Sequence, residues 1–192
     1  VLLHDACYSE VTFDGYQHPS LLQVPGAKDI AVEFHSLSKS FNMTGWRVGM
    51  AVGNGDILRS LFLVKSNLDS GVPQAIQEMA IEALSLSDEF FSERNSQYQK
   101  RRDLLVNALT SIGLTVPIPK ASLYVWAKVP TGYKSAQFAT LVLEELDIVV
   151  TPGTSYGVHG EGYIRLSLTL SDQDLEEGIR RLSTWSIPNL TN

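Results

Sequence analysis

Two short runs decide how this chain folds: Ser36-Leu37-Ser38-Lys39, and Gly45-Trp46-Arg47-Val48-Gly49 shortly after it. They place an amine, hydroxyls and a guanidinium around one short segment. A lysine amine can form a Schiff base with an aldehyde, which makes it a covalent catalyst of carbonyl chemistry. Serine hydroxyls and an arginine fork are strong partners of a phosphate. The pattern therefore predicts a lysine that binds a phosphate-bearing aldehyde, with the phosphate held beside it.

Lys39 is the first candidate catalytic residue. It follows an apolar run at residues 30–34 that predicts a buried strand, and serines flank it on both sides. A solvated surface lysine is the ordinary alternative, but the surrounding hydroxyls and glycines favour a functional role. The aldehyde that carries a phosphate and acts as an electron sink for carbanions is pyridoxal 5'-phosphate (PLP), which we expect as the cofactor.

Asp5 and Tyr8 form a second candidate group. Asp5 ends an apolar run at residues 1–4, the position at which open α/β sheets bind their ligands. A carboxylate there can pair with a pyridinium nitrogen and keep it protonated, which strengthens the electron sink. Tyr8 can donate to the phenolic oxygen of the same ring. The alternative is that Asp5 only caps a turn.

Arg165 is the third candidate, inside the apolar run at residues 163–168. A charge inside an apolar strand is costly unless it is paired. One interpretation is a structural ion pair with an internal acid. The other is capture of a substrate carboxylate, which the geometry of a guanidinium suits.

Composition limits the class of protein. The chain has 192 residues, 44% of them hydrophobic and 19% charged, with a net charge of −6. This acidic balance argues against a nucleic-acid or anionic-membrane partner, and no apolar run is long enough to cross a bilayer. The single Cys7 favours a reducing, cytoplasmic setting. The four histidines have no metal-ligand spacing, so we expect no metal.

The order of expected elements predicts two domains and an α/β class. Residues 1–112 alternate strand and helix and end in a long amphipathic helix at residues 88–109, which suggests a mostly parallel sheet. Residues 113–192 read as a small α+β unit. Expected strands are residues 1–4, 30–34, 48–52, 114–116, 123–129, 148–150 and 163–168; the other expected helices are 56–65, 72–83, 135–146 and 171–184.

The motifs Asp5-x-x-Tyr8, Ser36-x-Ser38-Lys39 and Gly45-x-Arg47-x-Gly49 resemble those of the class I and II aminotransferases of PLP fold type I. Residues 34–53 and 149–169 look most like the bacterial LL-diaminopimelate aminotransferase group, which serves lysine biosynthesis. The chain resembles the C-terminal half of such enzymes: residues 1–112 the end of the PLP-binding large domain, and residues 113–192 the small C-terminal domain.

The resemblance implies a role for each matching residue. Lys39 is then the Schiff-base lysine and proton shuttle, and Arg165 binds the substrate α-carboxylate. Asp5 pairs with the pyridine nitrogen and Tyr8 with the ring hydroxyl. The phosphate is held by Ser36, Ser38 and Arg47. Amino-acid and 2-oxo-acid substrates, a homodimer and the N-terminal half of the same protein are the implied partners.

Other functions share these motifs. A fold-type-I C–S lyase would release ammonia and pyruvate from a cysteine conjugate. A PLP-sensing domain of a transcription regulator would need an added DNA-binding segment.

The glycine-containing turn that cradles the phosphate and the aromatic residue that stacks on the cofactor ring are absent from this sequence. We therefore expect the isolated chain to be inactive and to bind PLP poorly.

Overall fold

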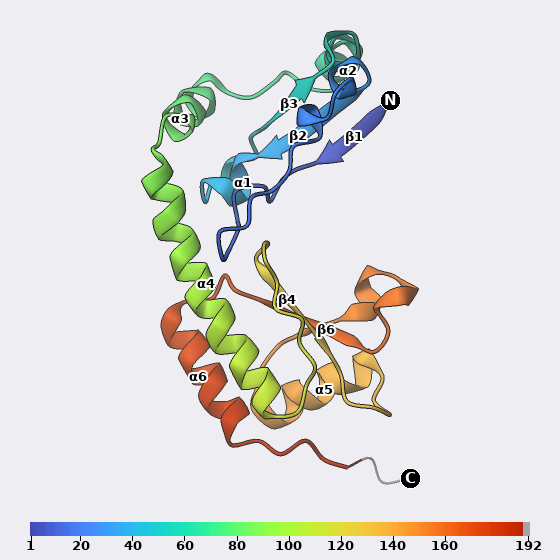
Figure 1. Cartoon of the computed structure of the whole chain (residues 1–192), viewed down its shortest axis with the longest axis vertical. Helices are drawn as coiled ribbons and strands as arrows, with labels where there is room; N and C mark the ends of the chain where they lie inside the picture. The colour runs from blue at the N-terminus through green and yellow to red at the C-terminus, as the bar shows by residue number, and fades with distance from the viewer. Residues whose placement is uncertain (190–192) are drawn as a thin grey trace. The chain divides into compact units, whose positions relative to one another are not determined.

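The computed structural model describes residues 1–189. The chain divides into two compact units, Val1–Asn95 and the part from Ser96 onward. The division lies within the long helix α4 (Asp88–Ser111), on the N-terminal side of the boundary expected at residue 112 (Figure 1). The assignment of functional domains stays a prediction.

The sheet of the first unit has the order β1 (Leu2–Asp5), β2 (Ala31–Ser36), β3 (Gly49–Gly53). β1 and β2 are parallel, whereas β2 and β3 are antiparallel. The mostly parallel sheet predicted from the sequence is therefore wrong for this unit, whose sheet is mixed. The backbone N–H of Leu37 donates to the carbonyl of Val48 at 3.2 Å. This bond joins the two ends of the segment that connects β2 to β3. As a result, β3 begins beside the end of β2 and runs antiparallel to it.

The longer helices of the first unit follow the sequence pattern closely, and one short helical turn was not expected from it. α1 (Leu37–Ser40) is a single turn directly after β2, and α2 (Gly55–Leu68) and α3 (Gln74–Leu84) follow β3. Asn54 caps α2 by accepting from the N–H groups of Asp56 and Ile57, each at 3.0 Å, as expected of a polar N-cap.

A small hydrophobic core of Leu37, Met43 and Ala83 packs under α1. Because α1 is too short to be stable alone, this packing and its capping bonds determine where its side chains lie.

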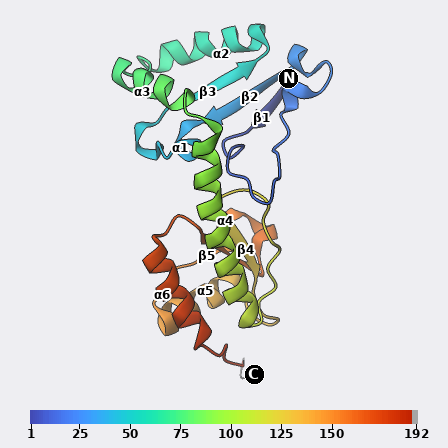
Figure 2. The same cartoon turned by 60° about the vertical axis from the view of Figure 1, so that its left-hand side comes forward.

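The second unit holds an antiparallel sheet of order β4 (Tyr124–Lys128), β6 (Tyr163–Ser167), β5 (Thr151–Pro152). Its helices include α5 (Ser135–Leu146) and α6 (Asp172–Ser183). In both views α6 lies beside the second half of α4 (Figures 1 and 2), where Arg101 pairs with Asp172 at 2.7 Å. This is the arrangement expected of a small α+β unit.

Two predicted strands of this unit are wrong. Residues 148–150 are not a strand, because Ile148 and Val150 line the core with Phe138 and Ile164 instead of pairing. Residues 114–116 contribute only a single bridge, from Thr115 to Lys128. Within the part of the chain that the structure describes, no helix has the length and hydropathy needed to span a membrane.

Candidate active site

The predicted cofactor residues emerge from one edge of the first sheet. Asp5 is the last residue of β1 and pairs in register with Phe34 of β2, while Ser36 ends β2 and caps α1. Because β1 and β2 are parallel, their carboxyl ends lie at the same edge, where α/β sheets place their ligands. The fold thus brings the Asp5 segment and the Lys39 segment side by side.

Lys39 is carried by α1, whose geometry Ser36 sets. The Ser36 hydroxyl oxygen accepts from the N–H of Ser38 at 3.2 Å. In this turn Leu37, Ser38 and Ser40 are buried, whereas Lys39 is only partly buried. The turn therefore packs its other side chains and leaves the lysine amine available for chemistry.

Arg47 reaches Ser38, as the spacing of the two runs suggested. Its Nη1 donates to Ser38 Oγ at 3.4 Å and to the carbonyl of Thr44 at 3.0 Å. Arg47 has a φ of 52°, a left-handed conformation that is costly for a residue with a side chain. Since both serine hydroxyls act as acceptors in these bonds, each keeps its proton to donate to a phosphate oxygen.

Gly49 lets β3 approach β2 at this point. A Cβ at Gly49 would lie 2.7 Å from the carbonyl oxygen of His35, a distance that side-chain carbons do not tolerate. The close approach places Arg47, two residues earlier, next to α1. The donor set of amine, hydroxyls and guanidinium therefore fits a phosphate-bearing aldehyde.

Hydrogen bonds from Cys7 favour the charged form of the Asp5 carboxylate. Its Oδ1 accepts from the N–H of Cys7 at 3.2 Å, and hydrogen bonds from Cys7 lower the pKa of Asp5 below its ordinary value. Burial, together with the neighbouring Asp5, raises the pKa of the Cys7 thiol to about 11. Asp5 thus caps the turn that leads to Tyr8. The raised pKa of Cys7 disfavours its reactive thiolate form.

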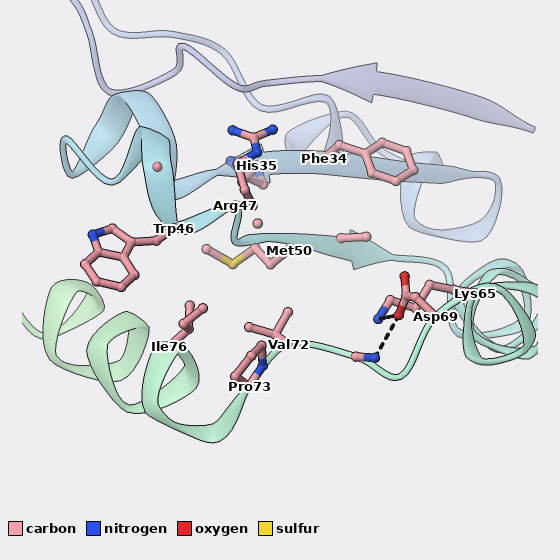
Figure 3. Close-up of a pocket in the computed structure, with 14 residues that line it drawn as sticks. Phe34, His35, Trp46, Arg47, Met50, Lys65, Asp69, Val72, Pro73 and Ile76 are labelled. Carbon is pink, nitrogen blue, oxygen red and sulfur yellow. Dashed lines mark hydrogen bonds and ion pairs between the residues drawn. The ribbon is translucent and has the colours of Figure 1, made fainter.

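An open cavity of about 730 Å³ adjoins Arg47, a size suited to a small molecule. Figure 3 shows Arg47 and Trp46 on one side and Val72, Pro73 and Ile76, at the start of α3, on the other. Lys39 does not line this cavity, so the cavity lies beside the lysine and not around it.

Arg165 lies on β6 of the second unit, opposite Trp126 and Thr151 of its neighbouring strands. Its guanidinium carbon is 3.9 Å from the centre of the Tyr124 ring and 4.4 Å from that of Tyr156. Among residues 1–189 no acid forms an ion pair with it, so the structural ion pair considered above is not found. Stacking engages the faces of the guanidinium and leaves its N–H edges to bind a carboxylate.

Glu33 was not expected from the sequence. It is 2% exposed and accepts from His4 Nδ1 at 2.9 Å, Ser20 Oγ at 2.8 Å and His35 Nε2 at 3.2 Å. Burial alone would raise its pKa, but the bonds from these groups and from the N–H of Leu21 outweigh burial and lower it to about 2. The histidines are therefore structural partners that join β1 and β2 through one carboxylate.

Arg94 of α4 is a second buried residue that was not expected from the sequence. It donates to backbone carbonyls of two segments: the turn that carries Lys39 and the loop that follows Tyr8.

In the described part of the chain, no three His, Cys, Asp or Glu side chains gather as a metal site would require.

Comparison with known proteins identifies the family. The model for aminotransferase class I and II matches residues 1–182. The chain is 59% identical to LL-diaminopimelate aminotransferase of Dehalococcoides mccartyi over 95% of its length and 47% of that protein. It is 54% identical to LL-diaminopimelate aminotransferase 2 of Nostoc sp. over 97% of its length and 48% of that protein.

Solved structures give the same result. The structure of an aminotransferase from Staphylococcus aureus superposes with a TM-score of 0.88 at 39% identity, over 94% of this chain and 48% of that one. The chain spans about half the length of the curated relatives it matches. From these matches and the arrangement of Asp5, Ser36, Ser38, Lys39 and Arg47, the chain belongs to the class I and II aminotransferases.

Proposed function

We propose that this chain forms the lysine-bearing part of a PLP-dependent aminotransferase that moves an amino group between LL-diaminopimelate and a 2-oxo acid. The observation that carries the proposal is the contact of Arg47 with Ser38 beside Lys39, at the same sheet edge as Asp5, whose pKa is lowered by hydrogen bonds from Cys7. The names of the relatives at 59% and 54% identity support the choice of substrate.

Each residue has a defined task in this reaction. PLP, when bound, supplies the electron sink that stabilises negative charge at the substrate Cα. Arg47, Ser36 and Ser38 hold the phosphate by charge and by donated hydrogen bonds. Asp5 keeps the pyridine nitrogen protonated through its carboxylate, and Tyr8 donates to the ring oxygen.

Lys39 has two tasks in turn. Its amine would hold the cofactor covalently in the resting enzyme. When it is free and neutral, the same amine would take the proton from the substrate Cα as a general base. Arg165 binds the α-carboxylate through the edge of its guanidinium and so fixes the direction in which the Cα proton points.

We further propose that the chain works as part of a longer cytoplasmic protein that forms a homodimer. The relatives support the first point, since the chain covers 47% and 48% of their lengths. The isolated chain should therefore bind PLP weakly, because the remaining half of such a protein would supply the rest of the phosphate cradle.

Borohydride reduction of the full-length protein with PLP tests the proposal. The label should be found on the peptide that contains Lys39, disappear in Lys39→Ala and persist in Lys65→Ala, a control lysine that lines the neighbouring cavity. Label on any other lysine would end the assignment.

A half-reaction screen tests the substrate. Full-length protein loaded with PLP should convert LL-diaminopimelate faster than glutamate or aspartate. Conversion of aspartate with none of LL-diaminopimelate would refute the substrate and leave the aminotransferase assignment standing.

A further inference from the structure

Arg94 is a buried cation that joins the two segments of the candidate site. It lies on α4 and is 7% exposed. Its Nη1 donates to the carbonyl of Ser40 and approaches that of Lys39 at 3.5 Å, while Nη2 donates to the carbonyl of Glu10. One guanidinium therefore holds the end of the lysine-bearing turn and the loop that follows Tyr8.

The guanidinium itself is held from several sides. Asn95 Oδ1 accepts from Arg94 Nε at 3.2 Å and from Nη2 at 2.8 Å, and Asn95 Nδ2 donates to the carbonyl of Glu10 at 2.9 Å. The rings of Phe91 and Phe90 lie 5.2 Å and 5.8 Å from the guanidinium carbon. These contacts leave the side chain little freedom to move.

The carbonyls that Arg94 binds need such a donor. α1 is only one turn long, so the carbonyls at its C-terminal end have no later N–H group of the same helix to accept from. Ser40 is 5% exposed, and a buried carbonyl without a donor is unfavourable. A cation at the C-terminal end of a helix is also favoured by the peptide dipoles.

We propose that Arg94 is a positioning residue for Lys39: it fixes the backbone of α1 relative to the Asp5–Tyr8 segment and thereby places the lysine amine. This inference rests on the proposed function, which gives Lys39 its role. A lysine at position 94 would keep the charge but could not bridge carbonyls of two separate segments, because only the guanidinium offers donors in a rigid fork.

Arg102 provides a matched control on the same helix. It is 2% exposed, its Nη1 donates to the carbonyl of Pro119 at 3.0 Å, and it bonds the next side chain, Asp103, at 2.9 and 2.7 Å. Arg94 and Arg102 are thus both buried arginines of α4 that donate to backbone carbonyls, and in the described part of the chain the contacts of Arg94 include the site segments, whereas those given for Arg102 are to Pro119 and Asp103. Arg102→Lys should lose stability without changing α1.

The test compares Arg94→Lys with Arg102→Lys in the full-length protein. Without PLP, amide hydrogen exchange at residues 37–43 should become about tenfold faster in Arg94→Lys and stay unchanged in Arg102→Lys. With PLP, kcat should fall by about 10- to 100-fold in Arg94→Lys with little change in KM, as expected for a misplaced catalytic group. Asn95→Ala, which loosens the guanidinium without removing it, should shift both quantities in the same direction by less.

Two results separate the possible failures. If Arg94→Lys and Arg102→Lys lose equal stability with no change of exchange at residues 37–43 or of kcat, Arg94 is only structural and the inference is wrong. If wild-type protein does not trap PLP on Lys39, the proposed function fails instead, and the exchange measured without PLP still decides whether Arg94 holds α1.

Discussion

Replacing Glu33 with glutamine should destabilise the protein in a way that depends on pH. Glu33 accepts hydrogen bonds from His4, Ser20 and His35, and these bonds are strongest when the carboxylate is ionised. Glutamine keeps the size of the side chain but removes the charge, and its amide turns an N–H group toward donors. The loss should therefore be electrostatic and not a loss of packing.

The size of the effect follows from the pKa of Glu33, which is about 2 in the folded protein against 4.5 for an ordinary glutamate. At 1.36 kcal/mol for each pH unit, this difference corresponds to about 3 kcal/mol of stability at pH 7. Because the folded pKa is the lower one, this stability is present above pH 4.5 and is lost as the pH falls toward 2. At pH 3.5 about 2 kcal/mol should remain.

Urea unfolding of the full-length protein and of its Glu33→Gln variant at pH 7 and pH 3.5 measures this difference. The gap in unfolding free energy should narrow from about 3 to about 2 kcal/mol between the two pH values. Glu78→Gln, an exposed position on α3, is the control and should change stability by less than about 0.5 kcal/mol at either pH. An equal gap at both pH values would show that the charge of Glu33 is not the source of its contribution.

Three further changes test other parts of the structure. Arg165→Lys should raise KM for every amino-acid substrate by about 10- to 100-fold through the loss of a bidentate contact and leave the absorbance of bound PLP unchanged; an unchanged KM would sink its role. Gly153→Ala should destabilise the protein by about 3 kcal/mol or more in thermal unfolding, because the new Cβ would lie 2.0 Å from the carbonyl oxygen of Gly160. Gly178→Ala, within α6 where the added Cβ would meet only ordinary contacts, should instead stabilise the protein by about 0.5–1 kcal/mol in the same measurement. Cys7, with a pKa of about 11, should be alkylated at pH 8 about 100-fold more slowly than a free thiol. Labelling at the rate of free cysteine in peptide mass spectrometry would contradict this raised pKa.

The sequence predicted which segments form strands and helices better than how the strands pair. The helix at residues 135–146 is confirmed without change as Ser135–Leu146, because its apolar spacing and its boundaries are local properties. The antiparallel direction of β3 is expressed in its backbone pairing with β2, from Ser36 with Gly49 to Val32 with Gly53, and backbone pairing leaves no hydrophobic pattern in the sequence. The apolar run at residues 148–150 resembled a strand, although Ile148 and Val150 line the core, Val149 is exposed and the run forms no strand.

Within the site, local contacts could be predicted and distant ones could not. The contact of Arg47 with Ser38 was suggested by the spacing of their motifs, and its role toward a phosphate stays a prediction. Glu33 bonds His4 across 29 positions of the chain, and Arg94 bonds Ser40 across 54. The sequence around a single charged residue in a strand or a helix does not indicate such a distant partner. The roles of Glu33 and Arg94 could therefore be recognised only from the three-dimensional structure.

The contacts of Arg165 with the rings of Tyr124 and Tyr156 have a consequence for how tightly the proposed carboxylate could be held. An arginine side chain carries about 2 kcal/mol of rotamer entropy, which a mobile arginine would lose on binding its ligand. Here the two rings restrict the guanidinium before any ligand binds. The rotamer entropy is therefore lost when the protein folds and not when the ligand binds. An affinity gain of up to about 30-fold is then available without any additional contact to the ligand. If Arg165 binds a carboxylate as proposed, the tyrosines would therefore strengthen that binding without touching the carboxylate.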